Sequence, residues 1–241
     1  MVRVSSIGAA AFALALASAA QAQQPVFNWT GFYVGAGVGW DRPSTNGDYR
    51  LIEDGVETFS ARVGRTGNGV QGHFFAGYGA NWGPWFASAE LGFGVSSTEA
   101  KRDFSFTTDD YYEVQTRLRQ YWSIVPSVRG GYLITPELLA FLRFGWAFTD
   151  TKLSYTAIEI EGGTVTRFAG STRRWLNGPR IGAGVEYAIL PNLRLRADGS
   201  FTWLSRISVT GAVPPPADSD VNAISSRPQQ GLLLFSAIYV F

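Results

Sequence analysis

The sequence predicts an all-β protein, a transmembrane eight-stranded antiparallel up-and-down β-barrel. Eight short segments alternate between bulky apolar residues and small or polar residues, as strands with two different faces do. The connections between these segments are long and short in strict alternation. The chain ends on the aromatic stretch GLLLFSAIYVF, which suits a last strand that closes a sheet in lipid, where an open edge cannot exist.

Residues 1–22 are predicted to be a cleaved signal peptide. Arg3 supplies the positive start, residues 7–20 form an apolar run too short to span a bilayer, and Ala20-Gln21-Ala22 is an A-x-A cleavage site. The alternative is a buried Ala-rich helix, which would not need these three features together. Cleavage after Ala22 leaves residues 23–241 as one barrel domain. Elsewhere no segment has the roughly 20 continuous apolar residues of a membrane helix, so strands must make any crossing.

Composition agrees with an exported membrane barrel. Aromatic residues make up 15% of the chain, Gly accounts for 28 residues and Cys is absent. Glycine lets a narrow wall curve, and Trp or Tyr suits the two membrane interfaces. The absence of Cys is consistent with export into an oxidising space. The net charge is close to zero, so we expect no nucleic-acid partner.

The first strand and the first hairpin show the alternation most clearly. Residues 28–40 read NWTGFYVGAGVGW, with a bulky face and a face of Tyr and Gly. Residues 70–82 and 85–95 alternate in the same way on either side of the tight turn Gly83-Pro84. Two alternating runs joined by a tight turn predict a β-hairpin.

Two further hairpins and the closing strand complete the barrel. The hairpins pair residues 121–133 with 140–148 and residues 180–189 with 193–203. Pro126 interrupts the first of these runs, because proline removes a ladder donor and belongs at an edge or bulge. The closing strand is residues 231–241. Four polar connections are predicted to be long loops: residues 43–69, 96–119, 149–174 and 205–230.

The alternation of long and short connections predicts an orientation. Bacterial barrels keep short turns on the periplasmic side and long loops on the cell surface. A chain that enters from the periplasm makes its first connection outside, and the first connection here is long. We therefore expect the four long segments at the cell surface, where loops on a rigid scaffold carry recognition.

The alternation alone does not say which face points inward, and a soluble lipocalin-like carrier would bury the apolar face. Three observations favour the membrane barrel. The polar face is rich in Gly, which suits a narrow interior better than a solvated surface. The chain ends on Phe241. Six Trp residues lie near strand ends on the apolar face, as in an interface girdle: Trp40, Trp82, Trp85, Trp122, Trp146 and Trp203.

Three stretches resemble a known family: NWTGFYVGAGVGW, GAGVEYAILPNLRLRAD and the C-terminal strand. They are similar to small OmpA-like, porin-family eight-stranded outer-membrane β-barrel proteins. The resemblance implies export to the outer membrane of a Gram-negative cell and recognition of Tyr239 and Phe241 by the barrel assembly machinery. The chain ends at the barrel, so no tether to the cell wall is expected. The last strand departs from the pattern, because its lumen side is apolar at Leu232, Leu234, Ile238 and Val240.

With the polar face inward, the lumen is predicted to hold a network of five Arg and three carboxylates. Buried charges must be paired, and the Arg fork fits a carboxylate with two contacts. One interpretation is a salt-bridged core that fills the barrel, since eight strands enclose only enough room for side chains. The other is a narrow, weakly anion-preferring pore. The residues are Glu90, Arg129, Arg143, Arg180, Glu186, Arg194, Arg196 and Asp198.

No catalytic, cofactor or metal site is expected. His73 is the only His, and its parity places it on the lumen side with no Ser beside it at a suggestive spacing. The alternative is a lipid-modifying enzyme with His73 as base, which would need a Ser and an acid within reach. Asp109 and Asp110 could form a cation or partner site, but such runs are more often solvated loop.

The leading hypothesis is therefore a structural outer-membrane protein that supports membrane integrity and acts as a surface scaffold. A small-solute pore is the alternative, an enzyme comes third and a soluble carrier fourth. The expected partners are outer-membrane lipids and lipopolysaccharide, the barrel assembly machinery and a surface ligand at the long loops.

Overall fold

The computed structural model describes residues 27–53, 56–107, 111–161, 164–211 and 221–241. The predicted signal peptide and the pair Asp109 and Asp110 lie outside the described residues. Within the described ranges, no helix has the length and apolar character needed to cross a membrane.

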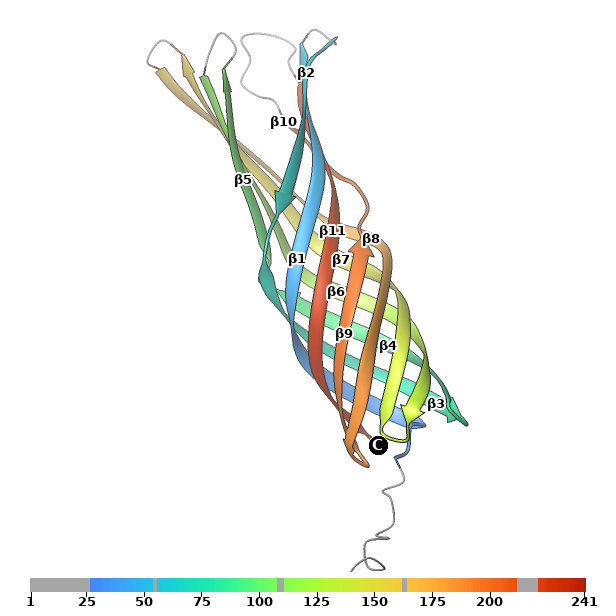
Figure 1. The fold of residues 1–241 in the computed structure, drawn as a ribbon. Coiled ribbons are helices and arrows are strands. Elements are labelled where there is room, and N and C mark those ends of the chain that lie inside the picture. Colours follow the sequence, from blue (N-terminus) through green and yellow to red (C-terminus); the bar gives the residue numbers. More distant parts are fainter. Residues whose placement is uncertain (1–26, 54–55, 108–110, 162–163, 212–220) are drawn as a thin grey trace, which may run out of the picture.

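The core of the fold is a closed ring of eight antiparallel strands (Figure 1). Each ring strand pairs with the ring strand that follows it in the chain, and β11 pairs with β1 to close the ring. The predicted fold class is thereby confirmed. The ring strands are β1 (Gly31–Glu53), β3 (Gly69–Trp82), β4 (Trp85–Ser96), β6 (Tyr111–Thr135), β7 (Leu138–Glu161), β8 (Thr164–Leu190), β9 (Leu193–Trp203) and β11 (Val221–Val240).

The seam between β1 and β11 joins the two ends of the chain. Its register runs without interruption from Tyr33 opposite Val240 to Ile52 opposite Val221. At the very end, the backbone N–H of Phe241 donates to the carbonyl of Phe32 at 3.0 Å. The wall is thus hydrogen-bonded around its whole circumference, which removes the open edges that lipid does not tolerate.

The four connections predicted as long loops are mostly β-structure, and this part of the prediction was wrong. The ring strands continue past the barrel, and three further strands pair with them: β2 (Val56–Thr66) with β1, β5 (Glu99–Thr107) with β6, and β10 (Ile207–Gly211) with β11. Strand pairing needs backbone hydrogen bonds but no apolar face, so polar segments that are wet on one side can extend a hairpin.

Beyond the ring, the wall therefore rises as two separate sheets (Figure 1). One is formed by the extensions of β1 and β11 with β2 and β10, and the other by β5 with the extensions of β6, β7 and β8. The bridge between Asn68 and Glu99 joins them near their base. We call the end of the barrel with the two sheets the long-hairpin end. The opposite end, which has the tight turns after β3, β6 and β8, is the short-turn end.

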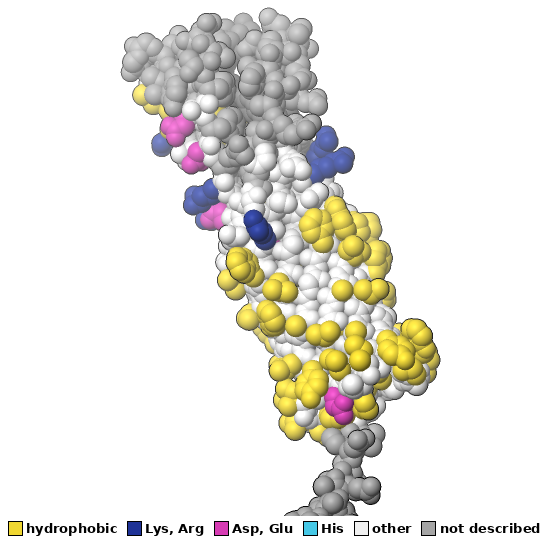
Figure 2. All heavy atoms as spheres, viewed as in Figure 1, with side chains coloured by type: hydrophobic (Ala, Val, Ile, Leu, Met, Phe, Trp, Pro, Cys, Tyr) yellow, Lys and Arg dark blue, Asp and Glu magenta, His cyan; other side chains and the backbone are white. Residues whose placement is uncertain are grey.

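The two faces of the wall are inverted relative to a soluble protein. Leu142 is 70% exposed and Phe74 58% exposed on the outside, whereas Glu186 is fully buried inside and Arg143 nearly so. On the face seen in Figure 2, hydrophobic side chains are spread over the ring, and most charged side chains lie beyond it on the long-hairpin side. This is the arrangement of a barrel whose outer face meets hydrocarbon.

Pro126 lies in the middle of the ring strand β6, and its side chain faces outward. It stays in register with Leu91 of β4, while the ladder between β6 and β7 skips Val125 and Pro126. The missing proline donor therefore interrupts one of the two ladders only. At the turn between β3 and β4, Gly83 has a φ of 61°, a left-handed conformation that glycine adopts without steric cost.

Candidate functional site

The inward side chains of five ring strands bring the eight predicted lumen residues into the interior. Glu90 comes from β4, Arg129 from β6 and Arg143 from β7, and the remaining five come from β8 and β9. Every one of the eight is at most 6% exposed. Charges buried to this extent are tolerated only when they are paired and hydrogen-bonded, so their contacts decide what the lumen can do.

Glu186 is the centre of one group of contacts. Its carboxylate accepts hydrogen bonds from Arg129 at 2.8 Å, from Arg194 at 3.1 Å and from the Nε of Arg196 at 3.1 Å. These donors come from β6 and β9, on either side of the strand that carries Glu186. A single buried carboxylate is thus enclosed by three guanidinium groups.

Glu90 is the centre of a second group. It accepts from Arg143 and from the Nη1 of Arg196, both at 2.9 Å, and from the hydroxyl of Tyr33 at 3.2 Å. Arg143 also donates to Asp198 at 3.2 Å. Because Arg196 contacts both glutamates, the two groups form one continuous network across the lumen.

Aromatic rings surround the network. The guanidinium of Arg194 lies 4.2 Å from the ring centroid of Trp29, that of Arg196 lies 4.3 Å from Phe75, and that of Arg129 lies 4.9 Å from Phe141. Cation–π contacts of this kind stabilise a cation that has lost its water. They also fill the space beside the ion pairs with bulky side chains.

Arg180 lies outside this network, in a second polar layer nearer the long-hairpin end. It donates to the hydroxyl of Thr202 at 2.7 Å and to the amide oxygen of Gln230 at 3.1 Å. Gln230 in turn donates to Asp41 at 2.8 Å and to Gln120 at 3.2 Å. Among the described residues, no carboxylate lies within 4.0 Å of the Arg180 guanidinium.

Asp41 is a buried lumen residue that the sequence analysis missed. It is fully buried and also accepts a hydrogen bond from the hydroxyl of Thr98 at 2.8 Å. The signal was present, since Asp41 continues the inward parity of Tyr33 to Gly39. It was overlooked because the first strand was predicted to end at residue 40, whereas β1 continues to Glu53.

Buried apolar clusters lie on both sides of the polar layers. At the short-turn end a buried cluster contains Trp29, whose indole N–H donates to the carbonyl of Pro136 at 2.9 Å. The other members of this cluster are Phe86, Leu139, Phe141 and Ala188. Where the two sheets rise from the ring, a second cluster is formed by Ala100, Leu118, Leu153, Tyr155, Leu176, Leu204, Ile207 and Val209.

Between the polar layers, a few buried polar atoms have no partner within the described part of the chain. They include both side-chain amide atoms of Gln71 and the Nδ1 of His73. Buried groups of this kind are commonly satisfied by bound water. No hydrogen bond to a Ser or a carboxylate is formed by His73 within the described ranges, and no group of three potential metal ligands occurs there.

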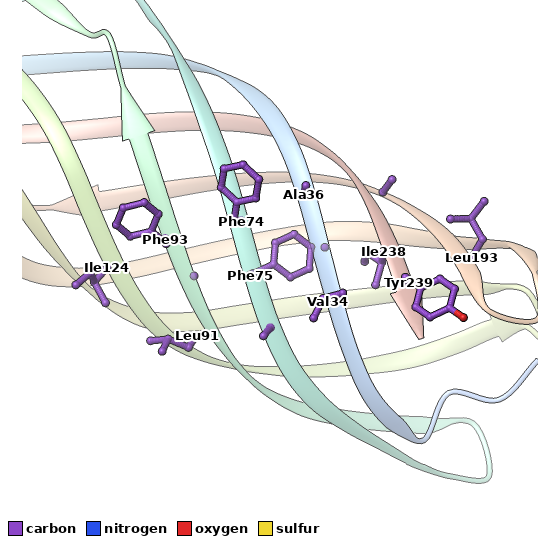
Figure 3. Close-up of a pocket in the computed structure, with 14 residues that line it drawn as sticks. Val34, Ala36, Phe74, Phe75, Leu91, Phe93, Ile124, Leu193, Ile238 and Tyr239 are labelled. Atoms are coloured by element: carbon purple, nitrogen blue, oxygen red, sulfur yellow. The ribbon is translucent and has the colours of Figure 1, made fainter. Parts of the chain in front are cut away.

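An apolar groove lies on the outside of the wall, between β1, β3, β4 and β11 (Figure 3). It has a volume of about 720 Å³ and is bordered by Phe74, Leu91 and Phe93, with the small residue Ala36 at its floor. Its outward position means that acyl chains would fill it in a membrane. We therefore place the candidate site in the lumen and not in this groove.

The C-terminal pair Tyr239 and Phe241 lies at the short-turn end. Both rings are exposed on the outer face, 46% and 73%, and their centroids are 5.3 Å apart in an edge-to-face arrangement. On the opposite face of the same strand, Leu232, Leu234, Ile238 and Val240 are buried, as the parity predicts. The pair is therefore accessible from outside the wall.

Comparisons with known proteins agree with this architecture. The family model described as outer membrane protein beta-barrel domain matches residues 9–225. A search of curated proteins finds no match. Among solved structures, the outer membrane protease OmpT from Escherichia coli is 10% identical, with 91% of this chain and 99% of that chain covered and a TM-score of 0.50. At that identity the likeness concerns the fold alone.

Two further solved structures are also similar. Neisserial surface protein A is 16% identical over 88% of this chain and 98% of its own, with a TM-score of 0.38. Ail, the attachment invasion locus protein of Yersinia pestis, is 13% identical over 88% of this chain and 99% of its own, with a TM-score of 0.35.

Proposed function

Because the chain belongs to the outer membrane protein beta-barrel domain family, we propose that it is a structural protein of the outer membrane, with a lumen closed to solutes. The observation that carries this proposal is the network around Glu186 and Glu90. Four guanidinium groups and three carboxylates interlock across the lumen, with a buried apolar cluster on either side of the polar layers. Such a core rigidifies the wall and leaves no room for a solute.

Planar-bilayer recording tests the closed lumen. Insertion is checked first, by the faster migration of the unboiled protein on a gel. The inserted wild-type protein should then give no reproducible current steps. Reproducible open steps with an anion preference would overturn the proposal in favour of a pore.

The narrow anion-preferring pore is the second candidate, and one observation favours it. Arg180 has no carboxylate partner within the described residues, and Gln71 and His73 present unpartnered polar atoms between the two polar layers. A single row of water molecules past these residues would lie in a lumen whose net charge is positive. The same recording separates the two functions, because only the pore predicts current.

We also propose that the long-hairpin end faces outside the cell, where the two sheets form a scaffold for recognition. In this proposal residues 1–22 are a cleaved signal peptide, and the barrel assembly machinery recognises Tyr239 and Phe241. An epitope inserted after Thr107, at the end of β5, should be stained on intact cells. An epitope inserted after Gly83, in a short turn, should be stained only after the outer membrane is opened, and the reverse pattern would contradict the orientation.

A further inference from the structure

Three cations lie side by side on the outer face of the second sheet. Arg119 of β6 is directly opposite Lys152 of β7, and Lys152 is directly opposite Arg173 of β8. We call these three residues the cationic row. Neighbouring strands are only about 4.8 Å apart, and like charges directly opposite each other destabilise a sheet. A row of three needs compensating negative charge.

The protein supplies only part of that charge. Arg119 donates to Glu99 at 3.2 Å, but Glu99 is shared with Arg117 at 2.6 Å and Lys101 at 3.5 Å. Three cations thus share the single carboxylate of Glu99, and the ion pair that Arg173 forms is with Asp150.

The ends of the row are held in place, whereas its centre is free. Arg173 is paired with Asp150, and its guanidinium lies 4.9 Å from the ring centroid of Tyr121. Lys152, in the middle, has no carboxylate within 4.0 Å in the part of the chain that the structure describes. Within the described residues, the row therefore presents a cation without a carboxylate partner between two anchored arginines.

The row lies directly beyond the aromatic residues of the apolar wall. On β8, the next outward residue from Arg173 toward the ring is Trp175, which is 54% exposed. On β6, Trp122 is 44% exposed. These two Trp residues, Arg173 and Asp150 line a surface pocket of about 560 Å³. Exposed Trp marks the membrane interface, so the row lies at the level of lipid headgroups. Figure 2 shows charged side chains just beyond the hydrophobic wall.

We propose that the cationic row binds the phosphate groups of an anionic glycolipid of the outer leaflet, with the sugar and acyl portion against Trp122 and Trp175. Arg and Lys form short, charge-assisted hydrogen bonds to phosphate, and an anchored Arg loses little freedom on binding. The bound anion supplies the negative charge that the row lacks. This inference rests on the proposed orientation, which places the long-hairpin end outside the cell.

The test measures lipid binding to the purified barrel in detergent with a chelator, so that divalent ions do not bridge phosphates. The probes are bisphosphorylated lipid A, the same lipid without phosphate, inorganic phosphate and a sulfated oligosaccharide. Wild type should bind the phosphorylated lipid most tightly. The double variant Arg119→Gln, Lys152→Gln should bind it roughly tenfold more weakly or worse, as expected for lost charge-assisted contacts.

A matched control removes two cations elsewhere beyond the wall. Arg42 and Arg227 are both exposed, and across the ladder between β1 and β11 they face the uncharged residues Gly231 and Asn46. The double variant Arg42→Gln, Arg227→Gln should keep wild-type affinity. Equal loss in both double variants would show that overall charge, and not the row, determines binding, and would overturn the proposal.

Lys152→Glu separates binding from a structural role. In vesicles of neutral phosphatidylcholine this variant should unfold at a higher urea concentration than wild type, because it relieves repulsion, yet it should no longer bind phosphorylated lipid. Unchanged binding by this variant, or tighter binding of the sulfated oligosaccharide than of the lipid, would overturn the row as a lipid site. Misplaced epitopes on intact cells would instead refute the orientation, so the two failures are distinguishable.

Discussion

Arg129 and Glu186 are joined by a 2.8 Å hydrogen bond across the lumen, although their strands, β6 and β8, are not neighbours in the ring. Backbone ladders connect only adjacent strands. This ion pair therefore adds a transverse connection that fixes the cross-section of the barrel. Arg196 extends the connection to Glu90, so ion pairs link strands on different sides of the lumen.

Glu186→Gln should destabilise the barrel by about 3–5 kcal/mol, because it leaves buried guanidinium groups without their shared counter-charge. Reversible urea unfolding in lipid vesicles measures this. Glu137→Gln, at the turn before β7, is the matched control and should change stability by no more than about 0.5 kcal/mol. A Glu186→Gln barrel as stable as wild type would show that the network contributes little.

Gly35→Ala should destabilise by about 1–3 kcal/mol, the usual range for overpacking. A Cβ built at Gly35 would lie 2.2 Å from the ring of Phe75 inside the lumen. Gly130→Ala is the control, since a Cβ there meets no atom within 4 Å. The same unfolding assay applies, and equal stability of the two variants would mean that the lumen is less tightly filled than its contacts indicate.

Phe144→Arg should destabilise by about 2–4 kcal/mol more than Phe144→Ala, because an Arg near the middle of the lipid-facing wall is costly. Phe144 is 55% exposed on the outer face of β7. Thr156→Arg, on the same face of the same strand but beyond the wall, faces the uncharged Gln115 and Ala169 and should have almost no effect. If both Arg variants behave alike, the outer face of β7 does not meet hydrocarbon.

Acid should loosen the base of the second sheet. Burial would raise the pKa of Glu99, but the hydrogen bond from Arg119 and the charges of Arg117 and Arg119 outweigh it and lower the pKa below 4.5. The resulting stabilisation is complete above pH 4.5 and is lost as pH falls through the lowered pKa. Hydrogen exchange in β5, relative to β9, should therefore rise on acidification in wild type, and Glu99→Gln should abolish this pH dependence. A variant that keeps it would assign the effect to another group.

The ring and its faces could be predicted from sequence because each depends on local pattern. Period-two alternation fixes which side chains share a face, and the glycines of the polar face together with the terminal Phe241 indicate that this face points inward. Tight turns such as Gly83-Pro84 fix which strands are neighbours. That is why Glu90, Arg143 and Glu186 could all be assigned to the lumen before their contacts were known.

The added strands and the grouping of the lumen charges could not be predicted from local sequence patterns. Polar segments carry no apolar face to reveal a strand, so the sequence predicts loops where the structure has the strand extensions and the added strands β2, β5 and β10. Asp41 was missed for the same reason, since it lies beyond the predicted end of the first strand. The separation of Arg180 from the other lumen arginines depends on strand stagger around the ring, which alternation does not encode.

The central claim is that the wall is inverted, with apolar residues toward lipid and paired charges inside. Because the chain has no Cys, single cysteines at Leu142, Phe144 and Ala147 of β7 can each carry a nitroxide in membrane-inserted protein. Collision rates with oxygen, which concentrates in lipid, and with a water-soluble nickel complex test the claim most directly. The structure predicts that labels at Leu142 and Phe144 meet oxygen but not nickel and that the label at Ala147 is immobilised and meets neither. Nickel collisions at Leu142 and Phe144 would contradict it.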